Sequence, residues 1–353
     1  MSPDPALSAV GCVSLETWDD VWRRNQHVAS RLVRLGLAHR IVFVEPPMLG
    51  HGAQRREVGE PGVEVVRPSL YVPKRLGGLR VAGLSLVRGH LRDVDVLWIN
   101  DPTLGVHCMR QQVPTAYDVT DDWRSFDAPH HIRRRLVAAE DALSHSARTI
   151  VCSEVLRDRW QQRYGVGAAV VQNGVDTRAV QTSTPHSLLG QAPHVGYVGT
   201  LHPERLDVAL VIELSERLGG TVHLVGPIDL PEGARRRLAA AGGVRLEGPV
   251  TASQVPAWTT AMDVLICPHL INDFTLSLDA IKAHEYLATA RPVVATRTSG
   301  FQALDAAGLS VVDRVSFSAA VLAALDVAPV RRVVVDWDVR TRAFAHELRA
   351  VAG

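Results

Sequence analysis

Short apolar runs alternate along the chain with longer segments in which apolar residues recur at helical spacing. In the first half, the runs lie at residues 40–47, 94–101, 113–122 and 147–154. Each run has a continuous β-branched or aromatic core, which is typical of strands in a parallel sheet covered by helices on both faces. The helical patterns at 18–36 and 130–146 come directly before two of these runs. This alternation predicts an α/β fold.

A second series of the same kind begins near residue 194. Its apolar runs are "HVGYVGT", "VHLVGP", "VRLEGPV", "DVLICP" and "RPVVAT", with helical patterns between them. The segment 177–193 breaks the rhythm and reads as a linker. We therefore expect an N-terminal domain over 1–176, a C-terminal domain over 194–330, and a tail over 331–353 whose helix packs back toward the N-terminal domain.

The two series predict two doubly wound, Rossmann-like α/β domains that face each other across a cleft. Sheets of this kind bind ligands beyond the carboxyl ends of their strands. A chain of 353 residues is also long for a single core. We expect the functional site in the cleft between the domains.

Composition narrows the class of protein only a little. The chain is 46% hydrophobic and 21% charged with a net charge of +1, so charge gives no reason to expect a nucleic-acid partner. The four cysteines are scattered without a CxxC pair or Cys/His cluster, which favours a reducing compartment and argues against structural zinc. We find no signal-peptide pattern and no apolar run long enough to span a membrane. The expectation is a cytoplasmic bacterial protein, at most peripheral on the inner face of the plasma membrane.

One basic stretch, 72–92, has no acidic residue and mixes lysine and arginine with leucine and valine. It is a candidate for peripheral contact with an anionic membrane or a phosphorylated acceptor. The alternative is a solvated amphipathic helix with a basic outer face.

The stretch "AIKAHEYLATARPVVAT" places Lys282 three residues before Glu285, so the two side chains share one face of a helix. Arg291 and Pro292 then end the helix before a buried strand. A surface ion pair is one interpretation of this spacing. A ligand site is the other.

A glycine loop at Gly199 follows the strand "HVGYV" and leads to Pro203, a plausible first helical residue. Free backbone amides at such a loop favour an anion. The GxGxxG and GxxxxGK[ST] fingerprints are both missing, so the loop alone is a weak signal.

The order of these pieces, "VVQNGVDTRAV", then "GYVGTLHPERLD", then "DVLICP" and "IKAHEYLATARPVVAT", resembles the retaining glycosyltransferases of family four, which have the GT-B fold. It is most similar to the bacterial branch that includes teichuronic-acid-type, cell-envelope and secondary-metabolite transferases. "WDDVWRRNQHVASRL" and "YDVTDDWRSF" in the first half fit the same branch. The resemblance covers nearly the whole chain.

The resemblance implies a nucleotide diphosphate sugar donor, most often a UDP- or GDP-sugar, with no metal. Glu285 takes the place of the family glutamate that accepts hydrogen bonds from the ribose hydroxyls. Lys282 and Arg205 fall where cations offset the diphosphate and serve as catalytic residues, and Gly199 and Thr200 lie in the loop that approaches it.

The chain departs from the family pattern at two positions. The first glutamate of the family pair is expected eight positions before Glu285, where this chain has Ser277. Thr275 and Ser277 offer hydroxyls to the donor instead, and Asp273 and Asp279 are close enough in sequence to substitute. Ala290 replaces a glycine that often ends this helix; a left-handed alanine there costs about 1 kcal/mol.

In the first domain, "YDVTDDW" brings Asp118, Asp121 and Asp122 to the end of an expected strand. We assign Asp121 to charge stabilisation in catalysis and Asp122, with Arg24, to acceptor binding. An N-cap cluster before "WRSF" explains the aspartates equally well.

The sequence thus predicts a retaining, metal-independent glycosyltransferase that moves a sugar from a nucleotide diphosphate to an acceptor hydroxyl on a lipid-linked or small molecule. Cell-envelope polysaccharide or secondary-metabolite biosynthesis is the expected setting. Because Ser277 replaces a glutamate, a catalytically weak nucleotide-sugar-binding auxiliary subunit is the alternative. A nucleotide-sugar epimerase or hydrolase is a third reading.

Overall fold

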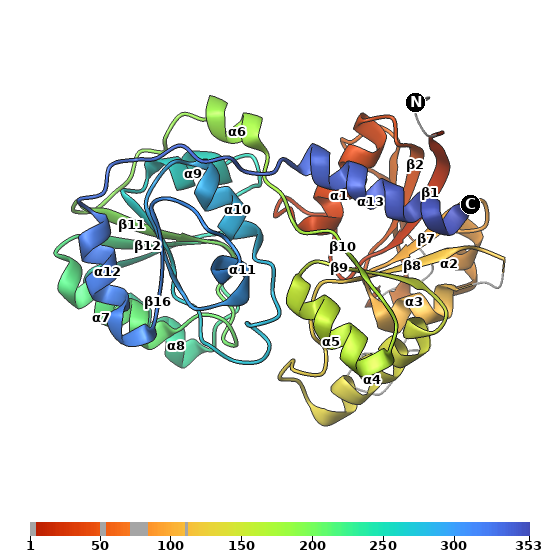
Figure 1. The fold of residues 1–353 in the computed structure, drawn as a ribbon, viewed down its shortest axis with the longest axis horizontal. Coiled ribbons are helices and arrows are strands. Elements are labelled where there is room, and N and C mark those ends of the chain that lie inside the picture. Colours follow the sequence, from red (N-terminus) through yellow and green to blue (C-terminus); the bar gives the residue numbers. More distant parts are fainter. Residues whose placement is uncertain (1–4, 50–53, 71–83, 110–111) are drawn as a thin grey trace. The chain divides into compact units, whose positions relative to one another are not determined.

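The computed structural model describes residues 5–49, 54–70, 84–109 and 112–353. The chain divides into two compact units (Figure 1). Unit 1 comprises Met1–Gln172 and Trp337–Gly353, and unit 2 comprises Asn173–Asp336. Of the basic stretch 72–92, residues 72–83 lie outside the described residues. The remainder of the stretch includes helix α2 (Leu84–His90).

Unit 1 is built on an eight-stranded sheet in the order β10-β9-β8-β7-β1-β2-β5-β4. Every neighbouring pair in it is parallel except β4 and β5. Its strands are β1 (Leu7–Val13), β2 (Ala38–Val44), β4 (Gln54–Glu57), β5 (Val63–Arg67), β7 (Val96–Ile99), β8 (Thr115–Val119), β9 (Arg148–Val151) and β10 (Ala169–Val170). A separate parallel pair joins β3 (Met48–Leu49) and β6 (Ser69–Leu70).

Helices enclose the sheet of unit 1. Helices α1 (Arg24–Arg34) and α13 (Trp337–Ala352) lie side by side, and α13 also packs on β7 and β8 (Figure 1). Helices α3 (Pro102–Cys108) and α4 (His130–Ser144) form a second packed pair, and α5 (Glu154–Tyr164) contacts β9 and β10. The strands are buried in between, and Val10, Val42 and Val96 have no exposed surface.

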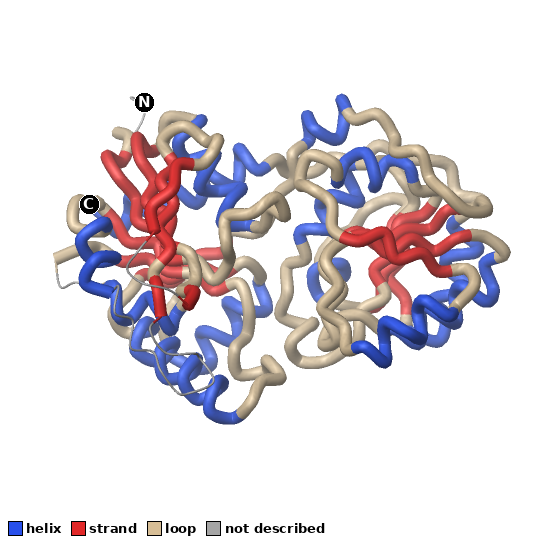
Figure 2. The backbone as a smooth tube through the Cα atoms, turned by 180° about the vertical axis from the view of Figure 1, so that it is seen from behind, coloured by secondary structure: helices blue, strands red, loops and turns tan. Residues whose placement is uncertain are grey.

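Unit 2 contains a six-stranded sheet, parallel throughout, in the order β13-β12-β11-β14-β15-β16. Its strands are β11 (His194–Val198), β12 (Thr221–Val225), β13 (Val244–Gly248), β14 (Val264–Cys267), β15 (Val293–Thr296) and β16 (Leu309–Val312). Its helices are α6 (Thr177–Thr182), α7 (Val208–Leu218), α8 (Glu232–Ala240), α9 (Val255–Ala261), α10 (Ile281–Ala288), α11 (Ser299–Gln302), α12 (Phe317–Ala324) and a 3-10 turn at Arg314–Ser316. Figure 2 shows the same plan in both units, with strands inside and helices around them.

The predicted α/β class of both halves is confirmed, and the expected strands of both series form. The strands that were not predicted are β1, β3, β4, β5, β6, β10 and β16, although β1 and β5 are interior strands of their sheet. The predicted linker, 177–193, begins with helix α6 and belongs to unit 2. The final helix, Trp337–Ala352, belongs to unit 1.

Two helix starts differ from the prediction. The helix expected from residue 18 begins at Arg24, because Gln26 accepts a hydrogen bond from the Arg23 amide and so caps the helix there. The helix expected at Pro203 begins at Val208 instead. Asp207 is its N-cap and accepts from the Leu210 amide at 2.9 Å, while the residues after His202 form a turn.

Candidate functional site

The strand order of unit 2 reverses between β11 and β14, because the chain adds β12 and β13 on one side and β15 and β16 on the other. In a parallel α/β sheet, this switch point is where loops diverge and a ligand fits at the carboxyl ends of the strands. Gly199 follows β11 at this place and His269 follows β14. The switch point therefore makes this edge of unit 2 the candidate ligand site on topology alone.

Gly199 and Lys282 approach each other closely at this edge. Gly199 has a φ of +143°, which side-chain-bearing residues rarely adopt. A β-carbon on Gly199 would lie 3.0 Å from Cε and 3.2 Å from Nζ of Lys282. The Nζ atom also lies 5.1 Å from the centroid of the Tyr197 ring, so a cation–π contact holds the ammonium beside the loop.

Arg205 brings a second cation to the same region. Its guanidinium lies 5.2 Å from the centroid of the Phe274 ring, and its carbonyl accepts from the Leu270 amide at 2.7 Å. Burial, followed by the charges of Lys282 and Arg205, holds the pKa of His269 well below its ordinary value. The two cations therefore act on one buried imidazole, and their combined field favours an anion.

His269 and Tyr197 connect the ends of the two central strands. The Tyr197 hydroxyl lies 3.3 Å from Nε2 of His269 and donates to the carbonyl of Thr200 at 3.1 Å. Thr200 itself is partly exposed. Tyr197 and His269 were not predicted as site residues, although each stands near the carboxyl end of a predicted parallel strand, a position that could have marked them.

Glu285 lies one helical turn after Lys282 on α10 and is partly exposed. Burial raises the pKa of its carboxyl, and the charges of Lys282 and His284 only partly oppose this effect. Among the residues that the structure describes, no side chain forms a hydrogen bond or ion pair with Glu285. A partly buried carboxylate without a hydrogen-bond partner is stabilised when a ligand supplies hydroxyl groups that donate to it.

Thr275 and Ser277 are both fully buried, and their hydroxyls bond within their own loop. The Thr275 hydroxyl donates to the Leu270 carbonyl at 2.6 Å, and the Ser277 hydroxyl donates to the Phe274 carbonyl at 2.7 Å. These side chains shape the loop before α10. Neither hydroxyl forms a hydrogen bond with Lys282 or Glu285.

Asp279, considered as a substitute for the missing glutamate, is buried in a network of its own. One carboxylate oxygen lies 3.0 Å from Nε2 of His284, and the other accepts from the Asn173 amide at 2.5 Å. The Asn173 side chain in turn donates to the Asp279 carbonyl at 2.6 Å. Asp279 therefore holds the loop before α10 to the start of unit 2.

In unit 1, Arg24 forms a buried bidentate ion pair with Asp118. Its Nε and Nη2 donate to the two carboxylate oxygens at 3.0 and 3.1 Å, and its guanidinium lies 5.5 Å from the Phe344 ring centroid. The Trp98 indole donates to the same carboxylate at 3.3 Å. The arginine expected at the acceptor thus joins α1 to β8.

Asp122 is also buried and lies among arginines of α5. Arg159 donates to it at 2.7 Å, Arg163 at 3.3 Å, and the Ser125 hydroxyl at 3.1 Å. Burial raises the pKa of Asp122, but Arg163 and Arg159 outweigh it and leave the pKa below its ordinary value. Asp121, the next carboxylate in the loop, is partly exposed and accepts from the Thr120 hydroxyl at 3.1 Å.

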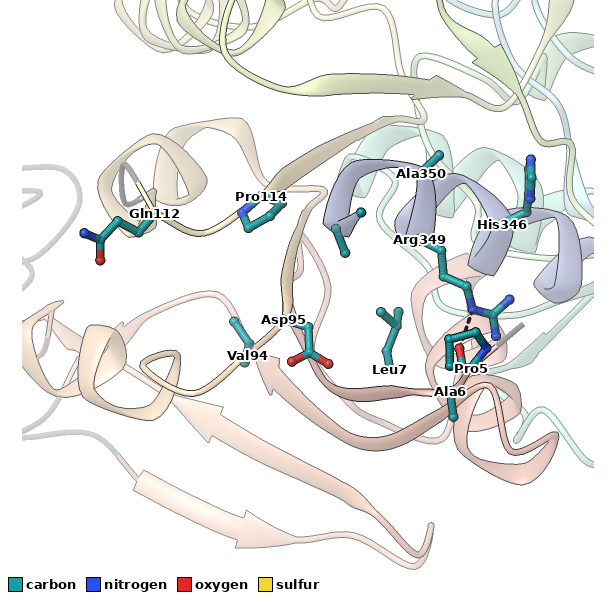
Figure 3. Close-up of a pocket in the computed structure, with 12 residues that line it drawn as sticks. Pro5, Ala6, Leu7, Val94, Asp95, Gln112, Pro114, His346, Arg349 and Ala350 are labelled. Atoms are coloured by element: carbon teal, nitrogen blue, oxygen red, sulfur yellow. Dashed lines mark hydrogen bonds between the residues drawn. The ribbon is translucent and has the colours of Figure 1, made fainter. Parts of the chain in front are cut away.

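A pocket of about 810 Å³ opens in unit 1 at the other, amino-terminal end of the strands (Figure 3). Leu7 and Asp95 line it beside the last turns of α13, where Arg349 donates to the Pro5 carbonyl at 3.0 Å. Its lining contains none of the predicted site residues.

In the described part of the chain, no helix has the length and apolarity needed to cross a membrane, and no cluster of three or more His, Cys, Asp or Glu is arranged to hold a metal ion.

Two family models match the chain. Residues 21–179 match "Glycosyltransferase Family 4", and residues 192–326 match "Glycosyl transferases group 1". The chain is a glycosyltransferase. A search of the curated proteins found no match to it.

Solved structures show the same GT-B fold. The glycosyltransferase is similar to sucrose-phosphate synthase from Thermosynechococcus elongatus, with a TM-score of 0.72 and 17% identity over 98% of this chain and 96% of that chain. It is similar to WaaG, a glycosyltransferase involved in lipopolysaccharide biosynthesis, with a TM-score of 0.69 and 16% identity over 97% of each chain. Anabaena HepE in complex with UDP-glucose has a TM-score of 0.64 and 15% identity over 97% of this chain and 99% of that chain. The predicted GT-B class is confirmed.

Proposed function

We propose that this glycosyltransferase moves a sugar from a UDP-sugar to an acceptor hydroxyl with retention of anomeric configuration. The observation that carries the proposal is the group of Gly199, Lys282 and Glu285 at the switch point of unit 2. Gly199 lets a ligand approach the backbone closely, and Lys282 supplies a cation. Glu285 supplies a carboxylate that has no hydrogen-bond partner among the described residues. HepE, which shares the fold, binds UDP and UDP-glucose, which favours UDP as the nucleotide.

Each side chain has a separate task in this proposal. Lys282 and Arg205 neutralise the diphosphate, and they gain most when its negative charge grows as the bond to the sugar breaks. Glu285 accepts hydrogen bonds from the two ribose hydroxyls, for which an acceptor-only carboxylate is suited. Gly199 and Thr200 let the backbone approach the phosphates. The leaving diphosphate then takes the acceptor proton on the same face of the sugar, so no protein nucleophile is needed.

For the acceptor we propose the carboxyl edge of the unit 1 sheet. Asp121 is the partly exposed carboxylate there, while Arg24 and Asp122 hold β8 and the following loop in place through buried ion pairs. The likeness to WaaG, which acts in lipopolysaccharide biosynthesis, supports a cell-envelope acceptor. A lipid-linked or small-molecule hydroxyl acceptor fits this proposal.

One observation favours a second candidate function, a nucleotide-sugar-binding auxiliary subunit with little activity. Ser277 stands where the resemblance calls for a sugar-contacting glutamate, and its hydroxyl is fully buried and bonded within the loop. In that case, the donor binds but no sugar is transferred.

Calorimetric titration with UDP-, GDP-, dTDP- and ADP-sugars, followed by an assay for nucleotide release with and without acceptor, separates these candidates. Selective binding of a UDP-sugar with acceptor-dependent UDP release supports the transferase. Binding without release under any acceptor supports the auxiliary subunit. Failure of all four nucleotide sugars to bind contradicts both.

A further inference from the structure

Helix α10, which carries Lys282 and Glu285, is short and has no side-chain cap at its amino end, while at its carboxyl end the Thr289 amide and hydroxyl bond the Tyr286 carbonyl. It spans only Ile281–Ala288, and its N-cap residue Ala280 forms no side-chain capping bond. Just after its C-terminus, Ala290 has a φ of +65°. A helix of this length is not stable alone, so groups outside it must fix its ends.

The Asp279 network fixes the amino end of α10. Asp279 lies one residue before the N-cap and links Asn173 to His284 through its two carboxylate oxygens. All three residues are buried, with exposed fractions of 8% or less. A buried carboxylate with two partners holds a fixed geometry, because loss of either partner leaves part of a buried charge unsatisfied.

Residues 330–332 fix the carboxyl end of α10. The Val330 amide donates to the Ala290 carbonyl at 2.8 Å. The Arg332 guanidinium donates to the carbonyls of Arg291 at 3.1 Å and Leu287 at 3.4 Å. A cation that bonds the last carbonyls of a helix also interacts favourably with the helix dipole.

The groups that hold the two ends of α10 lie in the segments through which the chain passes between the two units. Asn173 belongs to the first of these segments, and Val330 and Arg332 belong to the second. The unit boundary falls between Gln172 and Asn173 on the first passage and between Asp336 and Trp337 on the second. The two segments also pair with each other. Val175 forms a parallel bridge with Asp336, and the Asp336 carboxylate accepts from the amide and hydroxyl of Thr177 at 3.0 and 2.6 Å.

We infer that Asp279 and Arg332 are positioning residues for sugar transfer, which tie the two ends of α10 to the paired crossover segments 173–177 and 330–336. A ligand that orders α10 then also orders both crossover segments. This inference rests on the proposed function in one respect, namely that the donor nucleotide binds Lys282 and Glu285. Neither positioning residue contacts the donor in this account; both act through the helix.

Hydrogen–deuterium exchange of the full chain with and without UDP tests the inference. We expect saturating UDP to slow amide exchange in the site segments 199–205 and 281–288, and also in 173–177 and 330–336. Protection confined to the site segments overturns the inference and leaves the proposed function standing. No protection in the site segments contradicts the proposed function and removes this inference with it.

Variants at both ends of α10 separate positioning from direct binding. In Asp279→Asn, the amide side chain accepts through only one oxygen, so one of the two carboxylate bonds is lost. We expect its UDP affinity to stay within about threefold, its kcat with a UDP-sugar to fall about tenfold, and the protection of 173–177 to disappear. A loss of affinity that matches the loss of kcat would make Asp279 a ligand-binding residue and overturn the positioning role.

The exposed Asp305 of the same unit offers a matched control, and Asp305→Asn should change none of these quantities. Arg332→Lys provides the second test if Asp279→Asn does not fold. It keeps the charge but not the planar guanidinium, whose Nη1 donates to the Arg291 and Leu287 carbonyls while its Nε donates to the Ala307 carbonyl. UDP should then still protect 281–288 but no longer 330–336, and unchanged protection of 330–336 would overturn the inference.

Discussion

A β-carbon on Gly199 would lie 3.0 Å from Cε of Lys282, a residue 83 positions later in the chain. This closeness makes the glycine and the lysine one feature, because the ammonium reaches the loop only where no side chain stands.

Gly199→Ala should weaken UDP-sugar binding at least tenfold. The new methyl group meets the Lys282 side chain, and alanine does not readily adopt a φ of +143°. Gly233→Ala on α8 is the matched control, since a methyl group there would meet no atom within 4 Å and the φ of Gly233 is not positive. Calorimetry should show the loss for Gly199→Ala alone. Equal donor affinity in the two variants would contradict the arrangement.

Ala290→Gly should raise the free energy of unfolding by about 0.5–1 kcal/mol. Ala290 is the one described non-glycine residue with a positive φ, and glycine relieves that strain. Ala288→Gly, in the last turn of the same helix, should instead lower the free energy by up to about 1 kcal/mol. Urea unfolding measures both, and the same sign for the two changes would argue against a strained Ala290.

Acid should weaken the docking of α13 through His27. The His27 ring stacks on Trp337 at a centroid distance of 4.9 Å, and burial, then Arg31 and Arg34, lowers its pKa from 6.5 to about 3. Because the folded-state pKa is the lower one, its stabilising contribution is complete above pH 6.5 and falls as the pH drops toward 3.

His27→Phe keeps an aromatic stack but has no proton to bind. Between pH 7.5 and 5, the wild type should lose more unfolding free energy than this variant in urea titrations. Identical pH dependence of the two proteins would show that His27 is not held neutral.

The Arg24–Asp118 pair should be far more costly to break than to replace. Asp118→Ala leaves a buried guanidinium without its carboxylate, and we expect a loss of about 3–5 kcal/mol in unfolding free energy. The double change Arg24→Met with Asp118→Leu removes both charges and should recover much of that loss. A double variant as unstable as the single one would contradict the unpaired-charge explanation.

The sequence predicted the architecture well because continuous apolar runs such as "VDVLWIND" carry the parallel-strand signal without long-range information. It also picked Gly199, Lys282 and Glu285, of which the structure brings Gly199 and Lys282 into contact and places Glu285 one turn after Lys282 on the same helix. It did not reveal that Arg24, 94 residues before Asp118, pairs with it. Nor did it show that the Ser277 hydroxyl turns into its own loop. Such details depend on which residues meet across the fold, and spacing along the chain does not encode them.

Binding of the donor by Glu285 is tested most directly by calorimetry with UDP-glucose. The three proteins to compare are the wild type, Glu285→Gln, and Glu216→Gln on the exposed face of α7. Glutamine keeps the size of the side chain but not its charge or second acceptor oxygen. Since hydrogen bonds to charged groups contribute about 1.5–3 kcal/mol, Glu285→Gln should weaken binding by roughly 10- to 100-fold. Glu216→Gln should bind as the wild type does. Equal affinity of Glu285→Gln and the wild type for UDP-glucose would contradict the account.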